Sequence, residues 1–317
     1  MTFKKIVMLG FSDALLDSEH WQRLDSLGNN IVKLGKDSQN IVEELRGADC
    51  LLSNIFAVPI TREFIDAAPN LRYIGVYSTA YGKAEPEYAK TKNIPICNIP
   101  GFSTEAVAEF AIGAILEYIR DLERSKQLAR EGDFSEVPKF PIYEIMRKNF
   151  GVIGLGRIGY RIAELALAFG ANVYYWSRNR KPEAEQKGIK YKDIDRLLAE
   201  SDFLSINLPW NKDTNLFMNE VKIRKIKPGA IFVNLSPNEL IDFSALESRL
   251  AKNDMVYIAD HTDEMLPDLI KTLSNYKNCV LYPPLAFATK EARLNKQETF
   301  ISNIESFLRD VPTNVVN

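Results

Sequence analysis

Short runs of apolar residues alternate along most of this chain with longer segments in which apolar residues recur every three or four positions. The short runs suit buried strands and the longer segments suit amphipathic helices, so the alternation predicts β-α units around a parallel sheet. The pattern therefore predicts the α/β class. In the first hundred residues it predicts helices such as Glu19–Leu27 and Ile41–Arg46, and strands at Lys5–Leu9, Ile31–Leu34, Cys50–Ser53, Tyr73–Tyr77 and Pro95–Cys97.

A second series of β-α units follows a break at Pro100-Gly101. After the break, Ser103 is a suitable helix N-cap, and the apolar periodicity that follows predicts one long helix to about Arg130. Residues 132–141 contain two prolines and predict a connection. Six further strands suit a dinucleotide-binding fold, and they are predicted at Phe150–Ile153, Asn172–Trp176, Phe203–Ile206, Ala230–Asn234, Met255–Ala259 and Cys279–Tyr282.

The composition is that of an ordinary globular protein, with 317 residues, 46% hydrophobic and 26% charged. This length suits two domains. The three cysteines, Cys50, Cys97 and Cys279, are isolated and show no metal-ligand spacing. We therefore expect no metal site and no disulfide scaffold.

The charges are nearly balanced, with 40 basic and 42 acidic residues, so no nucleic-acid partner is expected. No apolar run has the length of a signal sequence or a membrane span, and we predict a cytoplasmic protein without a membrane partner. Only two histidines occur, His20 and His261, so any mechanism that needs a histidine base must use one of them.

A glycine motif follows the predicted strand Phe150–Ile153. Its sequence is Gly154-Leu155-Gly156-Arg157-Ile158-Gly159, and an apolar-periodic segment that ends at Gly170 comes next. Between a strand and a helix, Gly154 permits the tight turn, Gly156 lets a pyrophosphate approach the backbone, and Gly159 lets helix and strand pack closely. A ligand-free glycine turn is the alternative.

The end of the next predicted strand bears on which dinucleotide is preferred. An acidic residue there would accept the ribose hydroxyls of NAD and repel a 2′-phosphate. The chain has no acid at this point but reads Ser177-Arg178-Asn179-Arg180-Lys181. A hydroxyl and up to three cations favour NADP, with NAD still possible. The alternative is a basic surface turn without a ligand.

Several motifs in the same order resemble those of the D-2-hydroxyacid dehydrogenases, and the resemblance covers nearly the whole chain. They are Tyr73–Gly82, Pro100–Phe110, Phe150–Gly159, Leu198–Asp202 and Lys227–Asn234. The resemblance implies a Rossmann doubly wound nucleotide domain, about 102–285, inserted in a flavodoxin-like α/β substrate domain, about 1–101 plus 286–317. It also implies a homodimer formed largely through the nucleotide domains, and a substrate cleft between the two domains.

The resemblance also implies site residues. The pyrophosphate would rest on the backbone of Arg157 and Ile158, and the nicotinamide amide would meet Asp260. Thr79 and Ala80 stand where family members offer backbone N–H groups to the substrate carboxylate. The rest of the cofactor set would be Thr104, Gly154, Gly156, Gly159, Ser177, Arg178, Arg180, Leu208, Pro209, Leu235 and Ser236.

The chain departs from the family at all three catalytic positions. The family reaction moves a hydride between nicotinamide and C2 of a 2-keto or 2-hydroxy acid, and it uses an arginine, a glutamate and a histidine. The matching positions here are Pro237, Met265 and Pro284. None of these side chains carries a charge or transfers a proton.

Three nearby residues are candidates for compensation. His261 follows Asp260 and is either a substitute acid/base or a packed or surface histidine. Strand alternation favours the second, because it tends to turn the side chain away from the Asp260 face. Glu264 reaches the site only if its loop shifts by one residue. Lys83, in the carboxylate loop, either restores positive charge for the substrate or is a solvated lysine.

Two functional hypotheses follow. The first is an NADP-dependent oxidoreductase that acts on a small 2-keto or 2-hydroxy acid, or on another carbonyl, with an altered catalytic set. The second is a catalytically inactive NADP-binding pseudoenzyme with a regulatory or binding role. The glycine motif and Asp260 fit both, and the fold does not decide between them.

Overall fold

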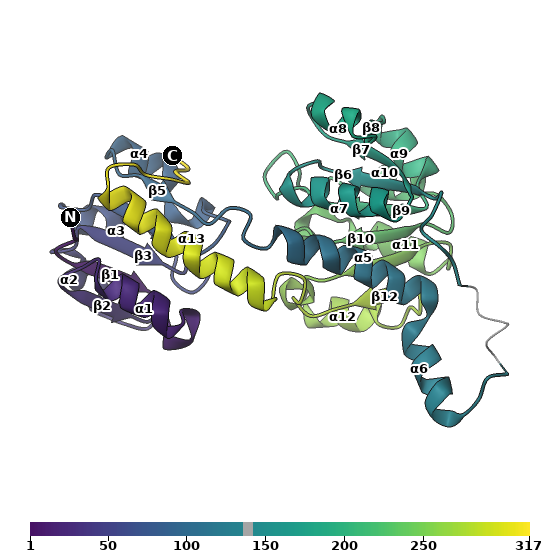
Figure 1. The fold of residues 1–317 in the computed structure, drawn as a ribbon, viewed down its shortest axis with the longest axis horizontal. Helices are drawn as coiled ribbons and strands as arrows, with labels where there is room; N and C mark the ends of the chain where they lie inside the picture. The colour runs from purple at the N-terminus through teal and green to yellow at the C-terminus, as the bar shows by residue number, and fades with distance from the viewer. Residues whose placement is uncertain (136–141) are drawn as a thin grey trace. The chain divides into compact units, whose positions relative to one another are not determined.

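A computed structural model describes residues 1–135 and 142–317 and divides the chain into two compact units. One unit consists of Met1–Ser103 and Lys290–Asn317, and the other of Thr104–Thr289. Each contains one parallel sheet (Figure 1). The α/β class predicted from the alternation is thereby confirmed.

The sheet of the first unit has five strands in the order β2-β1-β3-β4-β5, which is the flavodoxin-like order. Strands β1, β3 and β4 are buried along their whole length, because helices cover both faces of the sheet. The strands are β1 (Ile6–Leu9), β2 (Ile31–Leu34), β3 (Cys50–Ser53), β4 (Tyr73–Val76) and β5 (Ile96–Cys97). The helices are α1 (Ser18–Asp25), α2 (Ile41–Leu45), α3 (Arg62–Ala67), α4 (Pro86–Thr91) and α13 (Lys290–Leu308).

The C-terminal helix α13 belongs to this unit although it is almost two hundred residues away in the sequence. Phe300, Ile301 and Ile304 are buried in one core cluster with Phe3 and Tyr73 from the other end of the chain. Helix α13 contacts α1 and β4, and Figure 1 shows it lying along the sheet. Its burial explains why the N-terminal segment needs the C-terminal helix to complete its core.

The sheet of the second unit has seven parallel strands in the order β12-β11-β10-β9-β6-β7-β8. Read from β8, this is the Rossmann order 3-2-1-4-5-6 with a seventh strand at the edge. The strands are β6 (Asn149–Ile153), β7 (Asn172–Trp176), β8 (Lys190–Tyr191), β9 (Phe203–Ile206), β10 (Ile231–Asn234), β11 (Val256–Ala259) and β12 (Cys279–Leu281). The helices are α5 (Thr104–Arg120), α6 (Leu122–Glu131), α7 (Arg157–Ala168), α8 (Pro182–Gln186), α9 (Ile194–Glu200), α10 (Glu220–Lys225), α11 (Phe243–Leu250) and α12 (Pro267–Leu273).

The sequence predicted six strands in this unit, and the sheet has seven. The additional strand, β8, has only two residues, Lys190 and Tyr191, and pairs with Tyr174 and Tyr175 of β7. Two residues, one of them charged, give no apolar run to recognise, so this edge strand is defined by its pairing and not by its sequence pattern.

The prediction of one long helix from Ser103 to Arg130 is also wrong. The helix breaks at Asp121, which has φ 47° and ψ 50°. Aspartate tolerates this left-handed conformation better than most residues. Helix α5 before the break buries eight residues, whereas α6 after it buries none and extends away from the sheet (Figure 1). Of the predicted connection 132–141, residues 136–141 lie outside the described residues.

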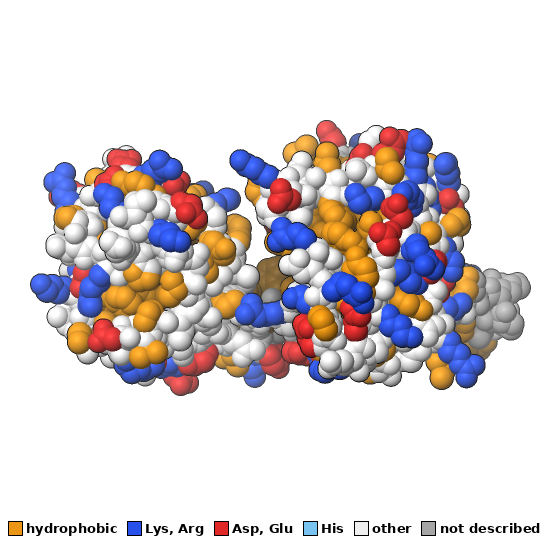
Figure 2. Space-filling model, turned by 90° about the horizontal axis from the view of Figure 1, so that it is seen from above, with side chains coloured by type: hydrophobic (Ala, Val, Ile, Leu, Met, Phe, Trp, Pro, Cys, Tyr) orange, Lys and Arg blue, Asp and Glu red, His pale blue; other side chains and the backbone are white. Residues whose placement is uncertain are grey.

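Basic and acidic side chains are interspersed on the face of the molecule drawn in Figure 2. Among the described residues, no helix combines the length and the apolar character that a membrane span requires. The same residues contain no group of three side chains that could hold a metal ion.

Candidate functional site

The glycine loop joins β6 to α7 at the carboxyl end of the second sheet, and two of its glycines are required by close contacts. Gly154 has φ +88°, and a Cβ there would lie 2.7 Å from Leu208 Cδ2. A Cβ on Gly159 would lie 2.0 Å from the carbonyl oxygen of Gly154. A Cβ on Gly156 would meet nothing within 4 Å. Gly156 therefore leaves open space beside the backbone, which is where a phosphate would approach.

Helix α7 begins directly at this loop. Its N-cap is Gly156, which supplies no side-chain hydrogen bond to the first turn, and the first turn contains no acidic residue. The backbone N–H groups of Arg157 and Ile158 thus lie at the positive end of a twelve-residue helix. This end can accept the negative charge of a pyrophosphate.

The loop after β7 contains the residues predicted to distinguish NADP from NAD. The Ser177 hydroxyl donates to the carbonyl oxygen of Asn179. Arg180 pairs with Glu185, to which its Nε donates at 3.0 Å, and this hydrogen bond raises the pKa of Arg180. Arg178 is exposed and forms no ion pair with a described residue. Of the two arginines, Arg178 is therefore the one available to a ligand.

Asp260 lies at the end of β11 and is only 1% exposed. Its Oδ1 accepts the backbone N–H groups of Leu285 at 2.8 Å and Ala286 at 3.1 Å. Its Oδ2 is buried and has no hydrogen-bond partner among the described residues. Burial raises the pKa of Asp260, and the two N–H groups oppose that rise. An unpartnered buried acceptor suits a ligand that brings a donor, such as a carboxamide.

Two hydrogen bonds fix the segment that follows β10 at the carboxyl end of the second sheet. Asn234 Oδ1 accepts the backbone N–H of Ser236 at 3.0 Å, and Ser236 Oγ donates to the carbonyl oxygen of Ile206 at 3.0 Å. Leu235 is half-buried beside them. Of the other predicted lining residues, Leu208 and Pro209 follow β9, and Thr104 begins α5 with a buried hydroxyl that has no partner among the described residues.

The three positions that depart from the family are accommodated locally. Pro237 precedes a short 3₁₀ helix, Asn238–Leu240. Met265 is 7% exposed and packs in a core cluster, where a carboxylate would be desolvated. Pro284 is half-buried in the loop after β12. None of these three side chains is titratable, so the family's three catalytic positions supply no proton donor or acceptor here.

Two of the three candidates for compensation, His261 and Glu264, lie after β11. This strand ends at Ala259, so strand alternation does not determine the direction of His261, and the sequence argument that turned it away does not apply. His261 is half-buried and precedes the 3₁₀ helix Thr262–Glu264. Glu264 is the exposed last residue of that helix.

Asn238 was not identified from the sequence. Its Nδ2 donates to the carbonyl oxygen of His261 at 2.7 Å, and its Oδ1 is buried without a partner among the described residues. The side chain thus ties the loop after β10 to the loop after β11. An asparagine in a loop carries no motif, so only the tertiary structure reveals this contact.

The predicted carboxylate loop follows β4 in the first unit. Asn98 Nδ2 donates to the carbonyl oxygen of Thr79 at 2.7 Å, and Thr79 Oγ1 donates to that of Ile99 at 2.7 Å. The backbone N–H groups of Thr79 and Ala80 donate to no described residue. They remain available to an anion. Lys83 is exposed, with its Nζ 5.5 Å from the ring centre of Phe56.

Comparison with known proteins identifies the family. Residues 112–286 match the model for the NAD-binding domain of D-isomer specific 2-hydroxyacid dehydrogenases. The chain is 32% identical to a hydroxypyruvate reductase of Blautia hydrogenotrophica, over 94% of both proteins. It is 33% identical to a glyoxylate reductase of Thermococcus litoralis, over 87% of this chain and 86% of that protein.

Solved structures agree with this assignment. An acyclic imino acid reductase in complex with NADPH and D-Arg superposes with a TM-score of 0.83 at 28% identity, over 99% of this chain and all of that chain. A D-lactate dehydrogenase of Aquifex aeolicus gives a TM-score of 0.82 at 23% identity, over 98% of both chains, and supports the fold alone. With the Rossmann strand order, the glycine loop and Asp260, these matches show that the chain belongs to the D-isomer specific 2-hydroxyacid dehydrogenase family.

Proposed function

We propose that this protein is an NADP(H)-preferring oxidoreductase that transfers a hydride between the nicotinamide and a small 2-keto acid or related carbonyl compound, with an altered proton-transfer set. The observation that carries the cofactor preference is the end of β7, where Ser177 and the unpaired Arg178 occupy the place of an acidic residue. A 2′-phosphate gains charge-assisted hydrogen bonds there and meets no repelling carboxylate.

The chain's own residues would hold the dinucleotide at both ends. The first turn of α7 would bind the pyrophosphate through Arg157 and Ile158. The unpartnered Oδ2 of Asp260 would accept the carboxamide N–H of the nicotinamide. When bound, the reduced nicotinamide supplies the hydride. Asn238 and the loop of His261 would form the adjacent wall, since Asn238 holds that loop in place.

The protein offers no conventional acid at the family's positions, because Pro237, Met265 and Pro284 cannot donate a proton. Two substrate classes follow from this difference. A keto acid would need a proton from another group, such as His261 or bound water. An imino acid needs less help, because a protonated imine already carries the proton that the amine product keeps. The 28% identical imino acid reductase supports this second class.

Calorimetric titration tests the cofactor proposal. NADPH should bind at least about tenfold more tightly than NADH, or roughly 1.4 kcal/mol. Arg178→Ala should remove most of that difference, whereas Arg180→Ala is the matched control, because Arg180 already pairs with Glu185. Equal affinities for the two cofactors, or a preference that survives Arg178→Ala, would refute it.

Single-turnover measurements test the reaction. Enzyme-bound NADPH is mixed with 2-keto acids, aldehydes and 2-keto acids with ammonia, and loss of nicotinamide absorbance is followed. Oxidation of NADPH by any of these supports an oxidoreductase. Tight NADPH binding with no oxidation across the panel would instead favour the pseudoenzyme hypothesis.

A homodimer is part of the same proposal. Near the end of α5 and the start of α6, a partner would cover a group of exposed apolar side chains: Leu122, Tyr143, Met146 and Phe169, each between 40% and 55% exposed. Sedimentation at micromolar concentration should give a species near twice the 36.0 kDa chain. A monomer would refute the dimer without affecting the cofactor proposal.

A further inference from the structure

Lys296 is a half-buried lysine on α13 whose ammonium lies among aromatic rings. Its Nζ is 4.3 Å from the ring centre of Tyr77 and 5.2 Å from that of Phe102. It forms no ion pair with a described acidic residue. Burial alone lowers the pKa of Lys296 to about 8. Cation–π contacts compensate only part of the lost hydration of an ammonium group, so an anion beside it would be strongly favoured.

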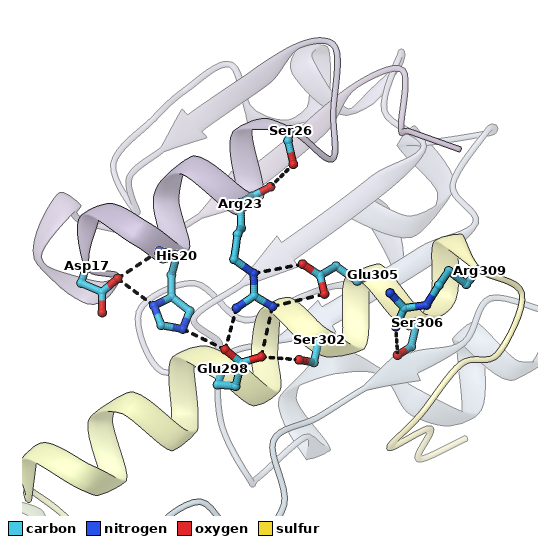
Figure 3. Close-up of polar contacts among 9 residues, drawn as sticks. All are labelled: Asp17, His20, Arg23, Ser26, Glu298, Ser302, Glu305, Ser306 and Arg309. Carbon is cyan, nitrogen blue, oxygen red and sulfur yellow. Dashed lines mark hydrogen bonds and ion pairs between the residues drawn. The ribbon is translucent and has the colours of Figure 1, made fainter.

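The acids in the network between α1 and α13 are already engaged with other side chains. Figure 3 shows Arg23 bonded to Glu298 and Glu305, and His20 beside Asp17. Hydrogen bonds from Arg23 lower the pKa of Glu298 to about 2, so this acid stays ionised and engaged with Arg23. Lys296 therefore has no counter-ion to draw from this network.

The charged groups around Tyr77 are few. Burial raises the pKa of Tyr77 to about 12, while Arg293 lowers it and Asp17 raises it electrostatically. Arg293 lies one turn before Lys296 on the same helix. The Tyr77 hydroxyl is occupied, since it donates to the carbonyl oxygen of Leu15 at 2.8 Å. Of these two cations on α13, Lys296 is the one in contact with the Tyr77 ring.

That loop supplies backbone donors for the same anion. Tyr77 is two residues before Thr79, and the backbone N–H groups of Thr79 and Ala80 donate to no described residue. Ser78 fixes the turn, because its hydroxyl donates to the carbonyl oxygen of Ala80. Lys296 Nζ thus lies against the ring of Tyr77, and the free backbone donors come two and three residues later in the same loop. A half-buried cation and backbone N–H groups are together suited to a carboxylate.

We propose that Lys296 binds the carboxylate of the substrate together with the backbone N–H groups of Thr79 and Ala80, and so supplies positive charge in a chain that has a proline at the family's arginine position. This inference rests on the proposed function and narrows it, since it selects small 2-keto or 2-imino acids over simple aldehydes. Lys296 is a binding residue in this role.

Titration of oxamate, an unreactive analogue of a small 2-keto acid, tests the inference in the presence and absence of NADPH. Lys296→Met should weaken oxamate binding at least tenfold, because methionine fills the aromatic surroundings without charge. Lys296→Arg should retain part of the affinity. The exposed Lys290→Met, on the same helix, should leave oxamate affinity unchanged. NADPH affinity should be the same in every variant.

A second measurement distinguishes binding from a structural role. The rate of acetylation of Lys296 by acetic anhydride, followed by mass spectrometry, should rise with a midpoint near pH 8. Saturating oxamate should protect Lys296 and move that midpoint upward, because a bound carboxylate stabilises the ammonium. Acetylation of Lys290 should not respond.

Each outcome bears on one proposal or the other. Equal oxamate affinity of Lys296→Met and the unmodified protein, or no oxamate binding to the unmodified protein, would overturn the role of Lys296. Failure to bind NADPH, with oxamate binding intact and dependent on Lys296, would overturn the proposed function and leave the anion site standing.

Discussion

The carboxylate of Asp260 accepts the backbone N–H of Leu285 at 2.8 Å, and this hydrogen bond joins the end of β11 to the loop after β12. The second oxygen of the carboxylate is buried and has no partner among the described residues. One side chain thus combines two tasks. Its satisfied oxygen fixes a loop, and its unsatisfied oxygen is poised for a donor from outside the chain.

Substitution of Asp260 separates these tasks. Asp260→Asn keeps an acceptor for Leu285 and Ala286 but places a donor where Oδ2 stood, so NADPH affinity should fall about tenfold with little loss of stability. Asp260→Ala removes both, and it should also lower the free energy of unfolding by about 1–3 kcal/mol. Calorimetry and urea unfolding measure the two effects. Unchanged NADPH affinity in Asp260→Asn would exclude a contact with the cofactor.

Substitutions in the glycine loop also distinguish effects on cofactor binding from effects on folding. Gly159→Ala brings a Cβ within 2.0 Å of a backbone oxygen, so the variant should fold poorly. Gly156→Ala meets no atom within 4 Å, so it should fold normally but bind NADPH at least tenfold more weakly. Gly113→Ala, which also meets no atom and lies within α5, is the control and should stabilise by up to about 1 kcal/mol. Normal NADPH binding by Gly156→Ala would contradict a phosphate at this position.

Much of the fold follows from the sequence because parallel strands buried on both faces are continuous apolar runs. Cys50–Ser53 and Phe203–Ile206 were predicted with the bounds that the structure gives. The hydrophobic pattern does not predict an element whose existence depends on strand pairing, or whose end depends on the backbone conformation of one residue. The two residues of β8 are a strand only through β7, and Asp121 breaks a helix that its neighbours would continue.

The site divides in the same way. The glycine loop was predictable because its residues are contiguous, and close contacts require Gly154 and Gly159. Lys296 was not, because Tyr77 and Phe102 lie about two hundred residues before it in the sequence. The sequence around Lys296 is polar, so by itself it predicts a lysine exposed to solvent. Only the packing of α13 on the sheet reveals that this one is half-buried beside a loop with free donors.

The ion pair between Glu298 of α13 and Arg23 of α1 predicts that the stability of the fold depends on pH. The pKa of Glu298 falls from an ordinary value of 4.5 to about 2, mainly through hydrogen bonds from Arg23. Ionised Glu298 therefore stabilises the fold above pH 4.5, and this contribution is lost as the pH falls through about 2. Because Glu298 is half-exposed, we expect about 1 kcal/mol or less.

Urea unfolding at pH 6 and pH 2.5 checks this dependence. Glu298→Gln should be less stable than the unmodified protein at pH 6, and the difference should shrink at pH 2.5. Glu291→Gln, at the exposed start of the same helix, should match the unmodified protein at both values. An equal deficit of Glu298→Gln at both pH values would show that its charge does not contribute.

The final prediction concerns turnover. Glyoxylate, pyruvate and hydroxypyruvate should be reduced slowly, because the family's arginine and histidine positions are Pro237 and Pro284. Loss of a general acid alone costs about 10²–10⁴-fold in rate, and loss of an orienting charge adds to it unless Lys296 supplies that charge. Steady-state assays with saturating NADPH should give turnover numbers below about 1 s⁻¹. A faster rate would show that another group transfers the proton, and His261→Ala would identify it: a large loss of kcat with unchanged NADPH affinity assigns the role to His261, and an unchanged kcat assigns it to water or to another side chain.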